Sequence, residues 1–126
     1  MTTKILIVDD STINNILLQN YLEARGYDVL TALNGNEALQ LIERESVDVM
    51  LLDMMMPGLN GLDVLSILDK KNLHIPTIII SAFIDSKYKA EALKLGALEY
   101  MDKPLNLNGL LQSIEHISEN SSASLK

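Results

Sequence analysis

Short aliphatic runs alternate with stretches of helical periodicity along the chain, and this alternation constrains the fold more than any other feature. The runs are Lys4–Val8, Asp28–Thr31, Val47–Leu52, Pro76–Ile80 and Ala97–Met101. Unbroken apolar segments such as Ile5–Val8 and Ile78–Ile80 are typical of strands that are covered on both faces.

The stretches between the runs place apolar residues three and four positions apart, as amphipathic helices do. In chain order these stripes are Ile13, Leu17 and Tyr21 with Leu18 and Leu22 beside them; Ala38, Leu41 and Ile42; Leu62, Leu65 and Leu68; Ala90, Leu93 and Ala97; and Leu107, Leu110, Leu111 and Ile114. Gly26 and Gly96 follow helices as C-caps do, and Asn34 lies where a helix begins. The repeated alternation predicts an α/β fold, a three-layer, doubly wound, five-stranded parallel sheet.

The chain length of 126 residues is that of one ordinary domain, which we assign to residues 1–117. Residues 118–126 are polar and are interpreted as a C-terminal tail, frayed or the start of a linker. Hydrophobic residues make up 48% of the chain, which is enough for a core without covalent staples. Because cysteine is absent, disulfides, zinc–thiolate sites and thiol catalysis are excluded.

The formal net charge of −7 argues against a nucleic-acid partner, because phosphate binding requires a basic face. No apolar run approaches the ~20 residues of a membrane span, so no membrane association is expected. No signal-peptide pattern precedes the first strand, and we therefore expect a cytoplasmic protein.

Chemically active side chains follow four of the predicted strands. Asp9 and Asp10 follow the first, Asp53 ends the third, Ser81 follows the fourth and Lys103 follows the fifth. Ligands of open parallel sheets bind outside the carboxyl ends of the strands. If the second strand lies at an edge, the other four are neighbours in the order 2-1-3-4-5, and these side chains converge.

Three converging carboxylates repel one another unless a cation lies among them, and oxygen ligands of this kind suit Mg²⁺ or Mn²⁺. The hydroxyl of Ser81 and the ammonium of Lys103 are donors suited to a phosphoryl group. A nucleophilic carboxylate, a metal site, a hydroxyl and a cation together predict formation of an aspartyl phosphate.

Each residue also has an ordinary structural interpretation. The Asp9–Asp10 pair and Ser81 can cap the helices that follow them, Asp53 can be a turn residue, and Lys103 can be an ordinary surface lysine. The functional interpretation depends on their occurrence together at four strand ends.

The chain resembles the receiver domains of two-component response regulators, the chemotaxis-regulator-like superfamily. The resemblance covers nearly the whole chain and is carried by five motifs: Ile5–Asp10, Asn34–Leu39, Leu51–Gly61, Pro76–Ala82 and Gly96–Pro104. It implies a flavodoxin-like (βα)5 sheet of order 2-1-3-4-5.

The resemblance also implies a role for each site residue. Asp53 would accept the phosphoryl group from a phosphohistidine on a histidine kinase or a histidine phosphotransfer protein. Asp9, Asp10, Asp53 and the backbone carbonyl of Met55 would hold Mg²⁺. Ser81 and Lys103 would contact the phosphoryl group, and the bond from Lys103 to Pro104 would be cis.

A switch and two partner surfaces follow from the same resemblance. Ser81 would move toward the phosphoryl group and Tyr100 would turn inward, which would change the surface of the fourth helix, fifth strand and fifth helix. The downstream partner, a protein or output domain that the sequence does not name, would read this surface. The residues of this output surface are Ile84, Lys87, Tyr88, Lys94, Glu99 and Met101. The phosphoryl donor would dock on a second surface, around Asn14, Asn15 and Leu18.

The sequence departs from many receivers at two positions. Met55 and Phe83 are apolar where one polar side chain often helps to place the hydrolytic water, so we expect slow loss of the phosphoryl group.

Two alternatives remain open, and a third is disfavoured. A metal-dependent phosphatase or phosphotransferase would share the aspartate, metal and lysine, but no acid lies two residues after Asp53 and no inserted lid is present. A receiver-like binding module that works without phosphorylation would not require the intact set of site residues. A flavodoxin-like cofactor binder is disfavoured by acidic strand-end loops. We therefore expect no enzymatic activity other than autophosphorylation and autodephosphorylation of the domain itself.

Overall fold

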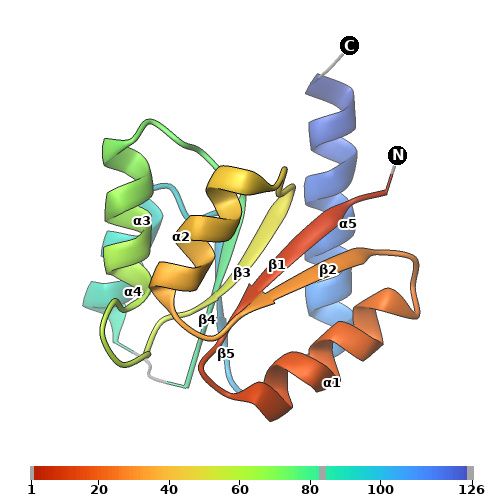
Figure 1. Ribbon diagram of the computed structural model, residues 1–126, viewed down its shortest axis with the longest axis horizontal. Coiled ribbons are helices and arrows are strands. Elements are labelled where there is room, and N and C mark those ends of the chain that lie inside the picture. Colours follow the sequence, from red (N-terminus) through yellow and green to blue (C-terminus); the bar gives the residue numbers. More distant parts are fainter. Residues whose placement is uncertain (1, 83–84, 125–126) are drawn as a thin grey trace.

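Strand and helix alternate throughout the computed structural model, which describes residues 2–82 and 85–124 (Figure 1). The strands are β1 (Lys4–Val8), β2 (Asp28–Ala32), β3 (Val49–Asp53), β4 (Thr77–Ser81) and β5 (Glu99–Asp102). The helices are α1 (Thr12–Glu23), α2 (Gly35–Arg44), α3 (Gly61–Lys70), α4 (Ser86–Lys94) and α5 (Leu107–Ser124). Neighbouring strands are parallel in the order 2-1-3-4-5, which confirms the predicted fold.

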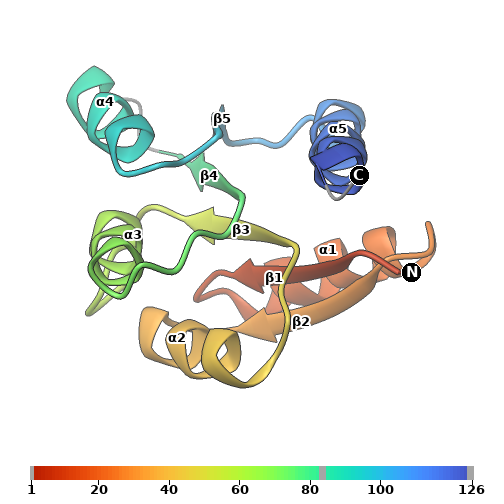
Figure 2. The ribbon, with the colours of Figure 1, turned by 90° about the horizontal axis from the view of Figure 1, so that it is seen from above.

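Helices cover both faces of the sheet (Figure 2), and a hydrophobic core lies between the sheet and the helices on each face. Successive strand residues point to opposite faces, so Leu6 and Val8 pack with α2, α3 and α4, while Ile5 and Ile7 pack with α1 and α5. This two-sided burial is the reason why the strands contain apolar runs rather than alternating polar and apolar residues.

The strand register brings the carboxyl ends of β1, β3, β4 and β5 to one edge. Val8 pairs with Leu52, so Asp9 follows β1 beside Asp53 at the end of β3. Asp53 pairs with Ile80, and Ser81 pairs with Asp102, the residue before Lys103. The convergence that the sequence predicted is therefore a consequence of register.

Helix termini follow the predicted punctuation. Asn34 is the N-cap of α2 and accepts a hydrogen bond from the N–H of Glu37. Gly26 and Gly96 adopt φ values of 93° and 108°, the left-handed region in which a side chain would be strained.

The buried face of α1 differs from the simplest interpretation of its apolar stripe. Ile13 and Leu17 are 70% and 63% exposed, whereas Asn15 and Leu22 are buried. The apolar residues of this helix cover a wide arc, so their spacing alone does not select the side that meets the sheet. Asn15 occupies that side because backbone carbonyls accept hydrogen bonds from its amide.

Helix α5 extends to Ser124, although the polar composition of residues 118–126 predicted a tail that begins at Ser118. No proline interrupts the chain after Pro104, and Ile117 is buried against the sheet one residue before the polar segment. The helical hydrogen bonds therefore continue through residues 118–124. The domain boundary at residue 117 stays a prediction.

Candidate functional site

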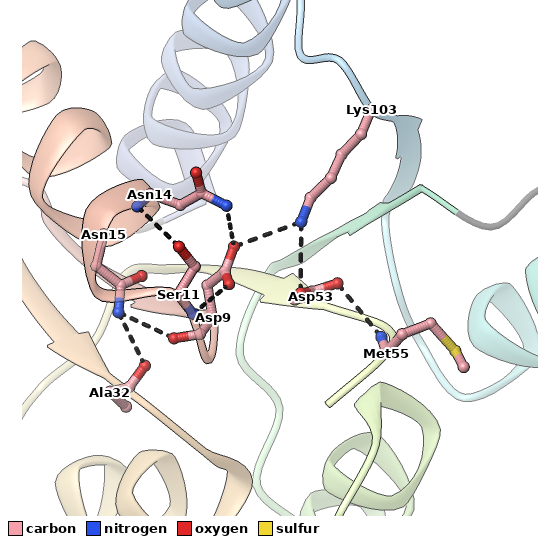
Figure 3. A network of polar contacts seen from close by, with 8 residues as sticks. All are labelled: Asp9, Ser11, Asn14, Asn15, Ala32, Asp53, Met55 and Lys103. Carbon is pink, nitrogen blue, oxygen red and sulfur yellow. Dashed lines mark hydrogen bonds and ion pairs between the residues drawn. The ribbon is translucent and has the colours of Figure 1, made fainter. Parts of the chain in front are cut away.

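Asp53 is the central acid of the site and is held from two sides (Figure 3). It is the last residue of β3 and is 6% exposed. One carboxylate oxygen, Oδ1, accepts a hydrogen bond from the backbone N–H of Met55 at 3.3 Å. The other, Oδ2, lies 3.4 Å from Nζ of Lys103. These contacts orient the carboxylate between the loop after β3 and the end of β5.

Asp9 lies beside Asp53 and has its own set of donors. Its Oδ1 accepts a hydrogen bond from the N–H of Ser11 at 2.8 Å. Its Oδ2 lies 3.4 Å from Nδ2 of Asn14 and 3.5 Å from Nζ of Lys103. The single ammonium of Lys103 thus contacts both carboxylates.

The acid pair after β1 does not cap the next helix. Ser11 is the N-cap of α1, and its side chain accepts a hydrogen bond from the N–H of Asn14. This observation argues against the purely structural interpretation of Asp9 and Asp10. The contacts of Ser11 and Asn14 with Asp9 were not predicted, although serine just before a helical pattern is a recognised N-cap signal.

Burial raises the pKa of the Asp53 carboxyl above its ordinary value of 3.8. The positive charge of Lys103 acts in the opposite direction, and the neighbouring Asp9 carboxylate raises the pKa further. The hydrogen bonds that Asp53 accepts from the backbone N–H of Met55 and from Lys103 lower its pKa. Additional positive charge at this position would therefore favour the ionised, nucleophilic form.

The three acids are arranged as metal ligands. Asp9, Asp10 and Asp53 can each offer one carboxylate oxygen such that all three atoms lie within 4.8 Å of one another. Oxygen ligands at this separation fit a hard divalent cation such as Mg²⁺ or Mn²⁺. The residues present therefore fit the cation that the sequence predicted.

The remaining predicted site residues lie at the neighbouring strand ends. Ser81 ends β4 and is fully buried. The peptide bond between Lys103 and Pro104 is cis, as predicted. Tyr100 of β5 is partly buried and packs against the core on the side of α2, α3 and α4.

A cavity of about 360 Å³ opens beside the acids, between α1 and the segment that leads into α5. Asp9, Asp53 and Lys103 contribute to its wall. Apolar side chains, among them Leu17 and Leu105, form most of the rest. A partner can therefore approach Asp53 across an apolar surface.

The predicted donor-docking residues differ in exposure. Asn14 is exposed and Leu18 is half-buried, but Asn15 is only 4% exposed. The prediction that Asn15 lies on a partner surface is therefore wrong. Its amide is used for hydrogen bonds to carbonyl oxygens inside the fold.

The predicted output surface is partly exposed where the structure describes it. Lys87 and Lys94 of α4 are exposed, whereas Tyr88, Glu99 and Met101 are partly buried. Ile84 and Phe83 lie outside the described residues.

A family model, the response regulator receiver domain, matches residues 5–115. The chain therefore belongs to the receiver domain family of two-component response regulators. This finding confirms the resemblance inferred from the five sequence motifs.

Individual relatives agree with the family assignment. The chain is 40% identical over 122 residues to the alkaline phosphatase synthesis transcriptional regulatory protein PhoP of Bacillus subtilis. The match covers 94% of this chain and 51% of PhoP, so the chain spans about half the length of that relative.

Solved structures show the same fold. The Francisella response regulator 1452 receiver domain superposes with a TM-score of 0.90 at 34% identity, and the match covers 95% of this chain and 99% of that chain. The response regulator TrrA of Thermotoga maritima, solved in complex with Mg²⁺ and BeF, gives a TM-score of 0.82 at 31% identity over 92% of this chain and 99% of that one.

Within residues 2–82 and 85–124, none of the helices has the length and apolar character needed to cross a membrane.

Proposed function

We propose that this receiver domain accepts a phosphoryl group on Asp53 from a phosphohistidine of an upstream histidine kinase or histidine phosphotransfer protein. The observation that carries the proposal is the position of Asp53, which lies beside two further acids and in contact with Lys103. A carboxylate oxygen of Asp53 attacks phosphorus, the bond between phosphorus and the donor imidazole nitrogen breaks, and its electron pair stays on that nitrogen.

Asp9, Asp10, Asp53 and the backbone carbonyl of Met55 would hold Mg²⁺ or Mn²⁺. When bound, the cation neutralises the acids and stabilises charge on the phosphoryl oxygens. The N–H of Met55 already donates to Asp53, which fixes this loop against the nucleophile. The N–H of Ser11 fixes the Asp9 carboxylate in the same way.

Lys103 and Ser81 would stabilise the phosphorylated state. Lys103 would transfer its contact from the carboxylate of Asp53 to the added phosphoryl oxygens, which carry more charge. Ser81 would donate its hydroxyl hydrogen to a phosphoryl oxygen, and Tyr100 would turn inward as the loop after β4 moves. The surface of α4, β5 and α5 would then present a different shape to a downstream protein or output domain.

The donor would dock on α1 and the adjacent cavity. Ile13, Ile16 and Leu17 are 70%, 50% and 63% exposed on this helix, and Asn14 lies beside them. Exposed apolar side chains next to a cavity that reaches Asp53 suit the apolar face of a histidine-bearing helix. Leu18 would contribute at the inner edge of this surface.

The proposal includes two limits on function. The domain would catalyse only its own phosphorylation and dephosphorylation, without turnover of a separate substrate. It would act in the cytoplasm, where histidine kinases use ATP to form the phosphohistidine.

Intact-mass measurement after incubation with acetyl phosphate and Mg²⁺ tests the proposal. Wild-type protein is expected to gain one phosphoryl group, and neither Asp53→Asn protein nor wild-type protein in EDTA should gain any. A mass gain that persists in Asp53→Asn protein, or no gain in the wild type, would overturn it. Steady hydrolysis of a phosphoester by the purified protein would favour a phosphatase.

A further inference from the structure

Asn15 connects three parts of the fold next to the acids. Its Nδ2 donates to the backbone carbonyl of Asp9 at 3.0 Å and to that of Ala32 at 3.4 Å. The carbonyl of Ala32 also accepts the N–H of Asp9 at 3.1 Å. One amide in α1 thus joins the end of β1 to the end of β2.

The orientation of this amide follows from its partners. Both groups that it faces are carbonyl oxygens, so Nδ2 must point toward them and Oδ1 must point elsewhere. Within the described part of the chain, no hydrogen-bond donor reaches Oδ1, although the atom is buried. A buried oxygen without a partner costs stability and offsets part of what the two donated hydrogen bonds contribute, so stability is an incomplete reason for asparagine at this position.

The carbonyl that Asn15 holds belongs to the peptide group between Asp9 and Asp10. That peptide group sets the direction in which Asp10 leaves the end of β1, while the carboxylate of Asp9 is held separately by Ser11. Side chains outside the ligand set that orient metal ligands typically change metal affinity when they are replaced.

We propose that Asn15 is a positioning residue that holds the peptide between Asp9 and Asp10 in the orientation that metal binding requires. It acts through the backbone and does not contact the cation. The inference rests on the proposed function, because it assumes that these acids hold a divalent metal. It also assigns a role to a residue that the sequence had suggested for partner docking.

The test measures binding of Mn²⁺ to unphosphorylated protein, with the unbound ion counted by electron paramagnetic resonance. Asn15→Leu keeps the branched shape and the number of non-hydrogen side-chain atoms but has no donor, and Asn15→Ala is smaller and fits without a clash. Both variants are expected to bind Mn²⁺ roughly tenfold more weakly than the wild type. The Mg²⁺ concentration that half-saturates labelling by acetyl phosphate should rise by a similar factor, with an unchanged rate at saturating Mg²⁺.

Thr77→Val is the matched control. Thr77 is fully buried at the amino end of β4, and its hydroxyl donates to the carbonyl of Ile75 at 2.8 Å. The substitution removes the hydrogen bond from a buried residue to a backbone carbonyl at the opposite edge of the sheet. Its Mn²⁺ affinity should equal that of the wild type, whatever its thermal stability.

Three results would decide the matter. Wild-type Mn²⁺ affinity in both Asn15 variants would overturn the inference, and so would an equal loss of affinity in Thr77→Val. Loss of affinity in the Asn15 variants alone would support it. Failure of the proposed function looks different, because the wild type would then bind Mn²⁺ without becoming phosphorylated on Asp53.

Discussion

The ammonium nitrogen of Lys103 lies 3.4 Å from Oδ2 of Asp53 and 3.5 Å from Oδ2 of Asp9. These residues are 50 and 94 positions away from Lys103 in the chain. The lysine therefore balances part of the charge of both acids in the unphosphorylated domain. From the same position it can also contact a phosphoryl group on Asp53.

Replacement of Lys103 by methionine should strengthen binding of Mn²⁺ to the unphosphorylated domain. The acids would lose a positive neighbour that disfavours a second cation, and for this partly exposed lysine we expect an effect of about 1 kcal/mol, roughly fivefold in affinity. Titration followed by electron paramagnetic resonance measures the change. Weaker binding in Lys103→Met would show that the lysine organises the acids rather than competing with the metal.

The stability of the metal-free domain should depend on the ionisation of Asp53. Because its folded-state pKa is raised, mainly by burial, the folded protein holds this proton more tightly than the unfolded chain does. The resulting stability is present below the ordinary pKa of 3.8 and is lost as the pH rises through the higher folded-state pKa. Asp53→Asn, which never ionises, should therefore have a higher Tm than the wild type at neutral pH in EDTA.

The same comparison contains its own check. The difference in Tm between wild type and Asp53→Asn should narrow as the pH falls toward 3.8. Asp28→Asn, at the exposed start of β2, serves as a control for removal of one negative charge far from the site. An equal rise in Tm for both variants would trace the effect to net charge rather than to burial of Asp53.

Met55 should influence how long the phosphoryl group survives. It is 52% exposed two residues after Asp53, and its apolar side chain offers no group that can place an attacking water. Met55→Asn should shorten the lifetime of the phosphorylated protein severalfold, whereas Met55→Leu should leave it unchanged. Loss of the added mass with time, measured after removal of acetyl phosphate, reports both lifetimes, and equal values for the two variants would refute the prediction.

Gly61 should be required for the position of Asp53. A methyl group at Gly61 would lie 3.0 Å from Cα of Met54 and 3.2 Å from the carbonyl oxygen of Asp53, both of them backbone atoms. Gly61→Ala should therefore lower the free energy of unfolding by about 1–3 kcal/mol and slow phosphorylation of Asp53. Chemical denaturation and intact-mass kinetics measure the two effects.

Gly109→Ala is the matched control for this substitution. Gly109 also lies in the first turn of a helix, α5, but a methyl group there would approach other side-chain atoms no closer than 3.6 Å. The variant should be unchanged or more stable by up to about 1 kcal/mol, since alanine favours helix. A similar loss of stability in both variants would point to helix-terminus effects rather than to contact with the strand of Asp53.

Much of the site was predictable because its residues mark the ends of strands. Asp9, Asp53, Ser81 and Lys103 each follow or end an apolar run, and strand order and register then bring them to one edge. The predicted strand bounds were close, although β3 begins at Val49 rather than Val47 and β5 at Glu99 rather than Ala97. The first residue of a strand depends on which backbone groups form hydrogen bonds with the neighbouring strand.

The side of α1 that meets the sheet was not predictable from its sequence. Ile13 and Leu17 have the spacing of a buried stripe, yet the helix packs through Asn15 and Leu22. The carbonyls of Asp9 and Ala32 that accept from Asn15 belong to this tertiary arrangement, whereas the Ser11 cap is local to the start of the helix.

The pattern of apolar residues in the sequence determined the fold of this protein, because strand and helix periods depend on neighbours along the chain. Its five motifs determined the family, and the polar residues at the strand ends determined which acids meet at the sheet edge. Only the tertiary structure decided which face of α1 is buried, which amide holds the peptide after Asp9 and how far α5 extends. The first two outcomes depend on which polar groups lie opposite one another after packing, and the last depends on the burial of Ile117 against the sheet. That information is spread over distant segments of the chain.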